Sequence, residues 1–204
     1  MVIWSILTEQ AWDDLQRRGR LRVARRHVMQ EFVGPYAWMA KQMERRLRTP
    51  RPSTDALPIW AWYQWEGVDR RKPDLRAAGY LTKAERGVRV ELEVADDRVL
   101  LSDFDLWHYV LNYWYLPATE KDGKAFEKKL ARTGLSFYGC NHQHPLPNNR
   151  YHREIERSWE RIFDMNWVDR GRVIASSPKK KSIQATLWEL LVDDVVGVRK
   201  FTAR

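Results

Sequence analysis

Glu189 and the pair Asp103 and Asp105 are the carboxylates of this sequence whose neighbours could give them a chemical role. Glu189 lies in the apolar stretch 183–191, which we expect to be a strand, and Gln184 lies in the same stretch. Alternation along a strand would place Gln184 on one face and Glu189 on the other. A glutamate among apolar strand residues is either on an exposed face or held for use. Asp103 and Asp105 lie at an expected strand-to-helix junction, where a role as helix caps explains them.

A further set of reactive side chains lies in a long loop expected around residues 134–150: Cys140, His142 and His144. Zinc sites need four ligands, or three and a water, at recognisable spacings, and only His152 follows nearby. We therefore expect a polar loop and no metal, with zinc binding or a Cys140–His142 nucleophile pair as alternatives. The sequence also lacks a glycine-rich phosphate loop and a Gly-x-Ser-x-Gly motif.

The tryptophan-rich stretch 58–65, Pro-Ile-Trp-Ala-Trp-Tyr-Gln-Trp, is the segment around which we expect the fold to be organised. Aromatic and β-branched residues favour strands, and alternation places Trp60 and Trp62 on the face opposite Ile59 and Ala61. Both faces are bulky and largely apolar. This pattern indicates either a central core strand or a strand with one face on the core and the other lining a ligand pocket.

The chain carries a formal net charge of +9, and its arginines are clustered in residues 17–26 and 45–51. A basic balance favours polyanionic partners. Our candidate nucleic-acid-binding residues are Arg22, Arg25, Arg26, Arg45 and Arg46. The alternative is a solvated basic face without a partner.

At 204 residues the chain fits one domain, and the order of its elements predicts a single α+β domain over residues 1–204. We expect a central mixed or antiparallel sheet flanked by helices, with a long loop or insertion around 134–150. A single cysteine and the absence of a leader or membrane-spanning run favour a cytoplasmic protein without a membrane partner. The oligomeric state is left open.

Helix caps, glycine stops and hydrophobic alternation along the chain predict individual elements. Residues 2–8 are predicted to form a strand. Thr8 is predicted to cap the helix that follows, and this helix is expected to end at Gly19. Further helices are expected over 36–47, 103–112, 119–133 and 150–164. Strict alternation over 88–94 predicts a strand that forms a hairpin with 99–101, and closing strands are expected over 182–190 and 195–201.

Several stretches resemble an uncharacterised bacterial and phage family, catalogued as domain of unknown function 3841. They span nearly the whole chain: residues 8–12, 36–39, 42–43, 58–62, 73–76, 100–107, 158–164 and 184–190. The family brings no established activity.

A second resemblance is to ADP-ribosyltransferase-type domains, through an opening strand, a helix ending in glycine, a Tyr-containing helix and a late strand with Glu189. It implies that NAD is the substrate, that Glu189 and Gln184 are catalytic, and that a toxin or phage-conflict factor modifies nucleic acid or protein. The glutamate in such enzymes orients the nicotinamide ribose and stabilises an oxocarbenium-like transition state. The implied cofactor-binding residues are Thr8, Gln10, Tyr36, Trp60, Trp62 and Asp103.

The resemblance is incomplete at the first strand, where such domains carry an arginine or histidine and this chain offers only Ser5 or Thr8. Two other hypotheses therefore stand beside the enzyme. One is a non-catalytic module in which arginines contact phosphates and tryptophans stack on bases. The other is a structural or regulatory protein whose tryptophans belong to the core.

Overall fold

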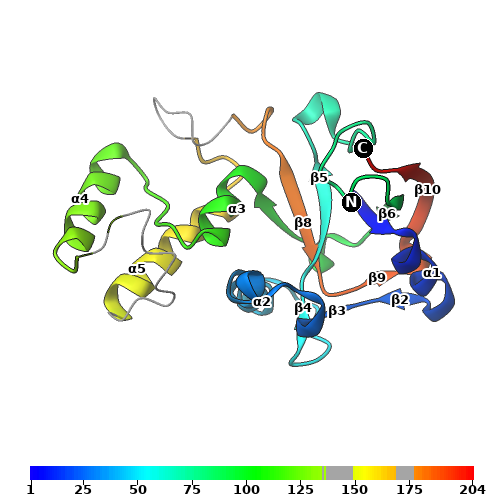
Figure 1. Ribbon diagram of the computed structural model, residues 1–204, viewed down its shortest axis with the longest axis horizontal. Helices are drawn as coiled ribbons and strands as arrows, with labels where there is room; N and C mark the ends of the chain where they lie inside the picture. Colours follow the sequence, from blue (N-terminus) through cyan, green and yellow to red (C-terminus); the bar gives the residue numbers. More distant parts are fainter. Residues whose placement is uncertain (135, 137–148, 169–176) are drawn as a thin grey trace. The chain divides into compact units, whose positions relative to one another are not determined.

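In the computed structural model, which describes residues 1–134, 136, 149–168 and 177–204, the tryptophan-rich segment forms β5 (Ile59–Gln64). It lies inside a six-stranded sheet with the order β10-β6-β1-β5-β8-β7 (Figure 1). The other strands are β1 (Val2–Thr8), β6 (Arg86–Glu93), β7 (Leu100–Asp103), β8 (Ile183–Leu187) and β10 (Val195–Thr202). The predicted central position of residues 58–65, in a sheet with residues 88–95 and the C-terminal strand, is confirmed.

The strand pairs β10–β6, β6–β1, β1–β5 and β5–β8 are all antiparallel, so the predicted α+β fold with an antiparallel sheet is confirmed. The predicted hairpin between 88–94 and 99–101 is wrong. A short 3-10 turn, Asp96–Arg98, follows β6, and β7 then pairs with β8 at the far edge of the sheet. A hairpin needs adjacent strands, and the neighbours of β6 are β1 and β10.

The chain divides into two compact units, which are described separately. Unit 1 comprises Met1–Leu101 and Ser182–Arg204, and unit 2 comprises Ser102–Lys181. The insertion expected around 134–150 falls within unit 2, and most of its residues lie outside the described part of the chain. A single domain over residues 1–204 stays a prediction.

Helix α1 (Glu9–Arg18) follows β1 directly and begins and ends as the sequence predicts. The Thr8 side chain accepts a hydrogen bond from the Ala11 amide at 3.1 Å, which satisfies one of the free N–H groups of the first turn. The chain leaves the helix at Gly19, whose φ of 71° is the left-handed conformation that glycine adopts without steric cost. This stop turns the chain into β2 (Arg20–Leu21).

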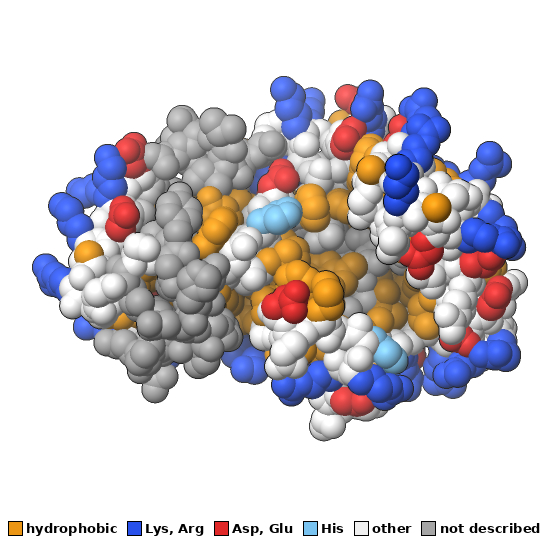
Figure 2. All heavy atoms as spheres, viewed as in Figure 1, with side chains coloured by type: hydrophobic (Ala, Val, Ile, Leu, Met, Phe, Trp, Pro, Cys, Tyr) orange, Lys and Arg blue, Asp and Glu red, His pale blue; other side chains and the backbone are white. Residues whose placement is uncertain are grey.

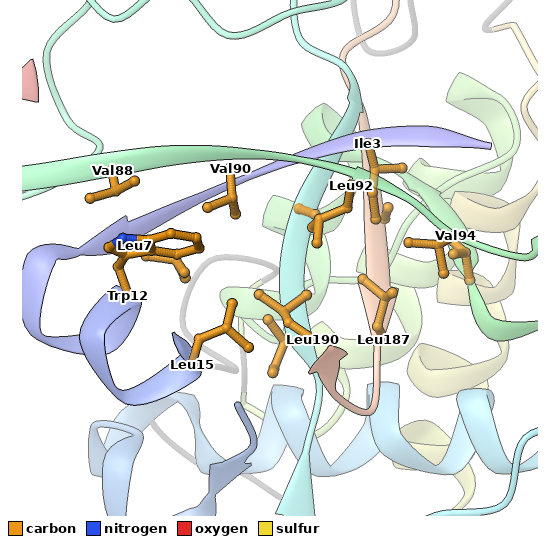
Figure 3. Close-up of a cluster of buried hydrophobic side chains, with 14 residues drawn as sticks. Ile3, Leu7, Trp12, Leu15, Val88, Val90, Leu92, Val94, Leu187 and Leu190 are labelled. Atoms are coloured by element: carbon orange, nitrogen blue, oxygen red, sulfur yellow. The ribbon is translucent and has the colours of Figure 1, made fainter. Parts of the chain in front are cut away.

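The hydrophobic core of unit 1 lies on one face of the sheet (Figure 3). Side chains from β1, β6, β8 and β9 (Leu190–Leu191) converge there with two side chains of α1, Trp12 and Leu15. Ile59 and Ala61 of β5 belong to this cluster, whereas Trp60 and Trp62 point to the opposite face and are only half-buried. Burial of the alternate residues fixes the register of β5, because a one-residue shift would exchange its two faces.

Three short strands and a helix complete unit 1. β2 pairs with β9, and β3 (Val23–Ala24) pairs with β4 (Ala56–Leu57). Helix α2 (Val33–Arg46) begins three residues before the predicted start at 36, and its buried side includes Trp38, Met39 and Met43. Pro35 occupies its first turn, where a missing N–H costs nothing.

Unit 2 is helical. Its elements are α3 (Phe104–Leu111), α4 (Glu120–Ala131) and α5 (Asn149–Ser158), which continues as a 3-10 turn over Trp159–Phe163. Trp159 is buried and donates its indole N–H to the Trp114 carbonyl at 2.6 Å. The Ser158 hydroxyl accepts from the Leu116 amide at 2.8 Å, which fixes the segment before α4 against α5.

A buried ion pair joins the start of α3 to the end of unit 2. The Asp103 carboxylate caps α3 by accepting from the amides of Asp105 and Leu106, and Lys181 Nζ lies 2.8 Å from its Oδ2. The side chains of Lys181 and Asp103 are 0% and 1% exposed. The ammonium also donates to the Trp167 carbonyl at 2.8 Å. Charges this far from water persist only when they are paired and hydrogen-bonded.

We expect Lys181→Met to lower the free energy of unfolding by about 3–5 kcal/mol, because the variant leaves the Asp103 carboxylate buried without its counter-charge. Urea unfolding followed by circular dichroism measures the change. Lys180 is exposed and adjacent, so Lys180→Met is the matched control and should change stability by less than about 0.5 kcal/mol. Equal losses in the two variants would contradict the pairing.

Candidate active site

Glu189 lies in a bend between two strands and not within a strand, so the predicted strand through residue 189 is wrong. β8 ends at Leu187, and β9 begins at Leu190. Trp188 is buried, and its indole N–H donates to the Thr49 carbonyl at 3.2 Å. Leu190 is buried in the core on the other side of the bend. The two buried flanks hold the bend and leave the Glu189 side chain partly exposed between them.

The pairing of β2 with β9 brings Arg22 to Glu189. Arg20 pairs with Leu191 and Leu21 with Leu190, so the next residues in this register, Arg22 and Glu189, face each other. Arg22 Nε donates to Glu189 Oε2 at 2.8 Å, and Nη2 lies 2.7 Å from the same oxygen. Both contacts involve Oε2, and no described residue donates to Oε1. The carboxylate is held in place with one oxygen still able to accept a hydrogen bond.

A second guanidinium lies near this carboxylate. Arg98 forms a two-bond pair with Asp194, with N–O distances of 2.9 and 2.8 Å. The hydrogen bonds to Asp194 raise the pKa of Arg98, and the Glu189 charge contributes to the same direction. Arg98 thus places a second positive charge near the Glu189 carboxylate.

Arg22 also lines a cleft of about 560 Å³ in unit 1. Thr8 and Gln10 from the start of α1 line the same cleft, together with Tyr36 of α2 and Trp60 of β5. On the face shown in Figure 2, hydrophobic side chains gather in the middle of unit 1, and Lys and Arg side chains gather along its edges. A cleft of this volume, apolar with a few polar groups, suits a small ligand.

Tyr36 and Trp60 form the aromatic wall of the cleft. Their ring centroids lie 5.6 Å apart at an interplanar angle of 64°, an edge-to-face arrangement. Burial raises the pKa of the Tyr36 hydroxyl, and its hydrogen bond with the Trp60 side chain lowers it by less. Tyr36 thus stays protonated at neutral pH, and the wall offers flat apolar surface for a ring to stack on.

Four of the predicted catalytic and cofactor-binding residues do not line this cleft: Glu189, whose partner Arg22 does line it, and Trp62, Gln184 and Asp103. Trp62 and Gln184 are paired in register between β5 and β8, on the face that carries Trp60. The Gln184 Oε1 atom is buried, and no described residue donates to it. Asp103 lies in unit 2, where capping α3 and pairing with Lys181 account for its burial. Of the predicted cofactor-binding residues, the cleft brings together Thr8, Gln10, Tyr36 and Trp60.

A second cleft of about 560 Å³ adjoins the first and shares Arg22 and His27 with it. Arg18, Arg20 and Arg26 also line it, together with the carboxylates of Asp14 and Asp55. Of the predicted nucleic-acid-binding residues, Arg22 and Arg26 lie in this basic cleft. Arg25 lies in the adjoining 3-10 turn, and Arg45 and Arg46 lie in the last turn of α2; none of the three lines either cleft.

Within the described ranges, no three His, Cys, Asp or Glu side chains gather where they could hold a metal ion. Cys140, His142 and His144 lie outside the described residues. His152 of α5 is bound to the Tyr113 hydroxyl through Nδ1. Of the helices in the described part of the chain, none combines the length and apolar character that a bilayer span needs.

Sequence reasoning missed the partnership of Arg22 with Glu189. The two residues are 167 positions apart, and only the pairing of two-residue strands joins them. Arg22 was singled out for its cluster of neighbouring arginines, which gives no information about a particular carboxylate. His27, which lines both clefts, carried no signal beyond its residue type.

Comparison with known proteins bears on the family and leaves the activity open. No curated protein and no solved structure has significant similarity to the chain. Residues 2–196 match a family described as Domain of unknown function (DUF3841), a match that covers most of both segments of unit 1 and all of unit 2. The chain belongs to the DUF3841 family.

Proposed function

We propose that unit 1 binds NAD and transfers its ADP-ribosyl group to a nucleic acid or protein acceptor. The observation that carries this proposal is the Glu189 carboxylate, which is held by Arg22, a residue that itself lines an aromatic-walled cleft. The resemblance of the Glu189 segment to ADP-ribosyltransferase-type domains points to the same chemistry. Such an enzyme would act in the cytoplasm, consistent with a single cysteine, and a role as a toxin or phage-conflict factor would fit it.

The two adjoining clefts suit a ligand with both flat rings and phosphates. The Tyr36–Trp60 wall offers an apolar surface on which a nicotinamide ring stacks. Arg20 and Arg26 in the neighbouring cleft offer guanidinium groups, which pair well with phosphate oxygens. Arg22 lines both clefts, so one extended dinucleotide could occupy them together.

The proposed reaction breaks the bond between nicotinamide N1 and ribose C1′. The bonding electron pair leaves with nicotinamide, which becomes neutral, and positive charge develops on the ribose. An acceptor oxygen or nitrogen then attacks C1′ and gives up its proton. Glu189 Oε1 would accept from a ribose hydroxyl, while the carboxylate charge stabilises the oxocarbenium-like transition state. Arg22 holds the carboxylate in position through Oε2.

We expect Glu189→Gln to lower the rate of nicotinamide release on the order of 100-fold or more, with little change in NAD affinity. The amide keeps the size of the side chain and an oxygen for Arg22, but it removes the negative charge that the transition state requires. Chromatography of released nicotinamide gives the rate, and isothermal titration calorimetry gives the affinity. Nucleic acid and protein acceptors are supplied in separate reactions.

Glu93→Gln is the matched control, because Glu93 is an exposed carboxylate on β6 outside the cleft, and it should leave the rate unchanged. Equal rates in wild type and Glu189→Gln would remove Glu189 from the site. If the wild-type protein neither binds nor consumes NAD but binds nucleic acid in a salt-dependent manner, the non-catalytic binding module replaces the enzyme.

We expect Trp60→Leu to weaken NAD binding about 10-fold or more, because it removes the ring on which nicotinamide stacks. Trp62→Leu is a matched control on the same strand and face, and Trp62 does not line the cleft. The two variants should lose similar stability in thermal melts yet differ in their dissociation constants for NAD. Equal weakening by both would place the ligand elsewhere.

A further inference from the structure

Unit 2 contains a separate cleft of about 610 Å³ with a strongly basic lining. Among the described residues, five cationic side chains and one carboxylate line it. The charged lining residues are Lys129, Arg150, Arg153, Glu154, Arg157 and Arg161. None of them was singled out in the sequence, and none belongs to the clefts of unit 1. The excess of positive charge calls for an anionic ligand.

The arginines form a row along one face of a helix. Arg150, Arg153 and Arg157 of α5 follow the spacing i, i+3, i+7, which places side chains on one side of a helix. At about 1.5 Å per residue, Arg150 and Arg157 are about 10 Å apart along the axis. Arg161 extends the row into the 3-10 turn that follows. The charges are therefore spread along a line and do not converge on one point.

The middle of this row is available to a ligand. Arg153 and Arg157 are exposed, and neither has a hydrogen-bond or ion-pair partner among the described residues. Lys129 of α4 is paired with Glu154, which neutralises the one carboxylate among the described lining residues. Arg161 is half-buried and donates to the Leu116 and Ser158 carbonyls. Lys129 and Arg161 are thus held by other groups of the protein, while the guanidinium groups of Arg153 and Arg157 are exposed.

Aromatic packing makes one wall of the cleft rigid. The Tyr115 ring stacks on Phe126 of α4, with centroids 4.0 Å apart and an interplanar angle of 12°. The Tyr115 hydroxyl donates to the Asp122 carboxylate at 2.9 Å, so its position is fixed at both ends. Tyr115 is 6% exposed, so this packing gives the arginines a rigid support and offers no free ring face for a base to stack on.

We propose that this cleft binds the phosphate backbone of a single nucleic-acid strand. A point-like phosphate would need converging donors, whereas a row of guanidinium groups matches phosphates that repeat along a strand. A cleft of about 610 Å³ holds a drug-sized molecule, hence a short stretch of strand and not the width of a duplex. The proposal does not rest on NAD chemistry in unit 1.

The test uses the full chain and a fluorescently labelled single-stranded DNA long enough to span the arginine row. Binding is followed by anisotropy over a range of salt concentrations. The double variant Arg153→Gln/Arg157→Gln removes two phosphate contacts, so the slope of log K against log salt should become shallower by about 1.4. The same relation predicts about 25-fold weaker binding at about 0.1 M salt. Circular dichroism verifies that the variant is folded.

Lys121→Gln/Lys128→Gln is the matched control, since both lysines are exposed on α4 in unit 2 and neither lines the cleft. It removes the same charge and should leave the slope nearly unchanged. Equal weakening by the two double variants, or no binding by wild type, would overturn the proposal. Single-stranded RNA, duplex DNA and inorganic triphosphate are measured in parallel.

Stronger binding of the duplex than of either single strand would rule out a cleft built for one strand. Inorganic triphosphate that competes fully, with no gain in affinity from longer strands, would replace the strand with a small phosphorylated ligand. Nicotinamide release by the arginine variant, measured in the absence of nucleic acid, separates this result from a failure of the unit 1 site.

Discussion

The pairing of β2 with β9 is the contact on which the candidate site of unit 1 depends. These strands are two residues long, and alone they would be too short to be stable. Each is joined to a larger element, however. β2 leaves α1 through the left-handed turn at Gly19, whose carbonyl accepts from the Val192 amide at 2.9 Å, and β9 carries Leu190 into the core. Neither Arg22 nor Glu189 needs to be buried, because the backbone register already places them opposite each other.

The local structure of unit 1 follows closely from its sequence. A threonine before an acidic turn and a glycine after two arginines bound α1, and both caps form as their chemistry requires. Alternation predicted β5 and β6, and it also separated the core face of β5 from the face that carries Trp60. Such features depend on residues a few positions apart, whose interactions are visible in one sequence.

The rest of the fold depends on contacts between distant residues. Residues 88–94 and 99–101 read as a hairpin because the turn between them is short, yet β7 gains a partner in β8, which lies more than eighty residues later. The bend at Glu189 is equally hidden, because residues 183–191 contain no glycine or proline that would mark a break, and the strand stops only where Trp188 reaches the Thr49 carbonyl. The candidate site was predicted in part: its aromatic wall was found, but not the arginine that holds the glutamate.

The burial of Lys181 has a chemical consequence for the run Lys179-Lys180-Lys181. In the sequence these residues look like three equivalent amines, but Lys179 and Lys180 are exposed while Lys181 is sealed beneath the surface against Asp103. An acylating reagent that needs a neutral, accessible amine would therefore modify two of the three in the folded protein and the third only when unit 2 opens. Acylation of Lys181, compared with that of Lys179 and Lys180, would therefore measure how often unit 2 opens.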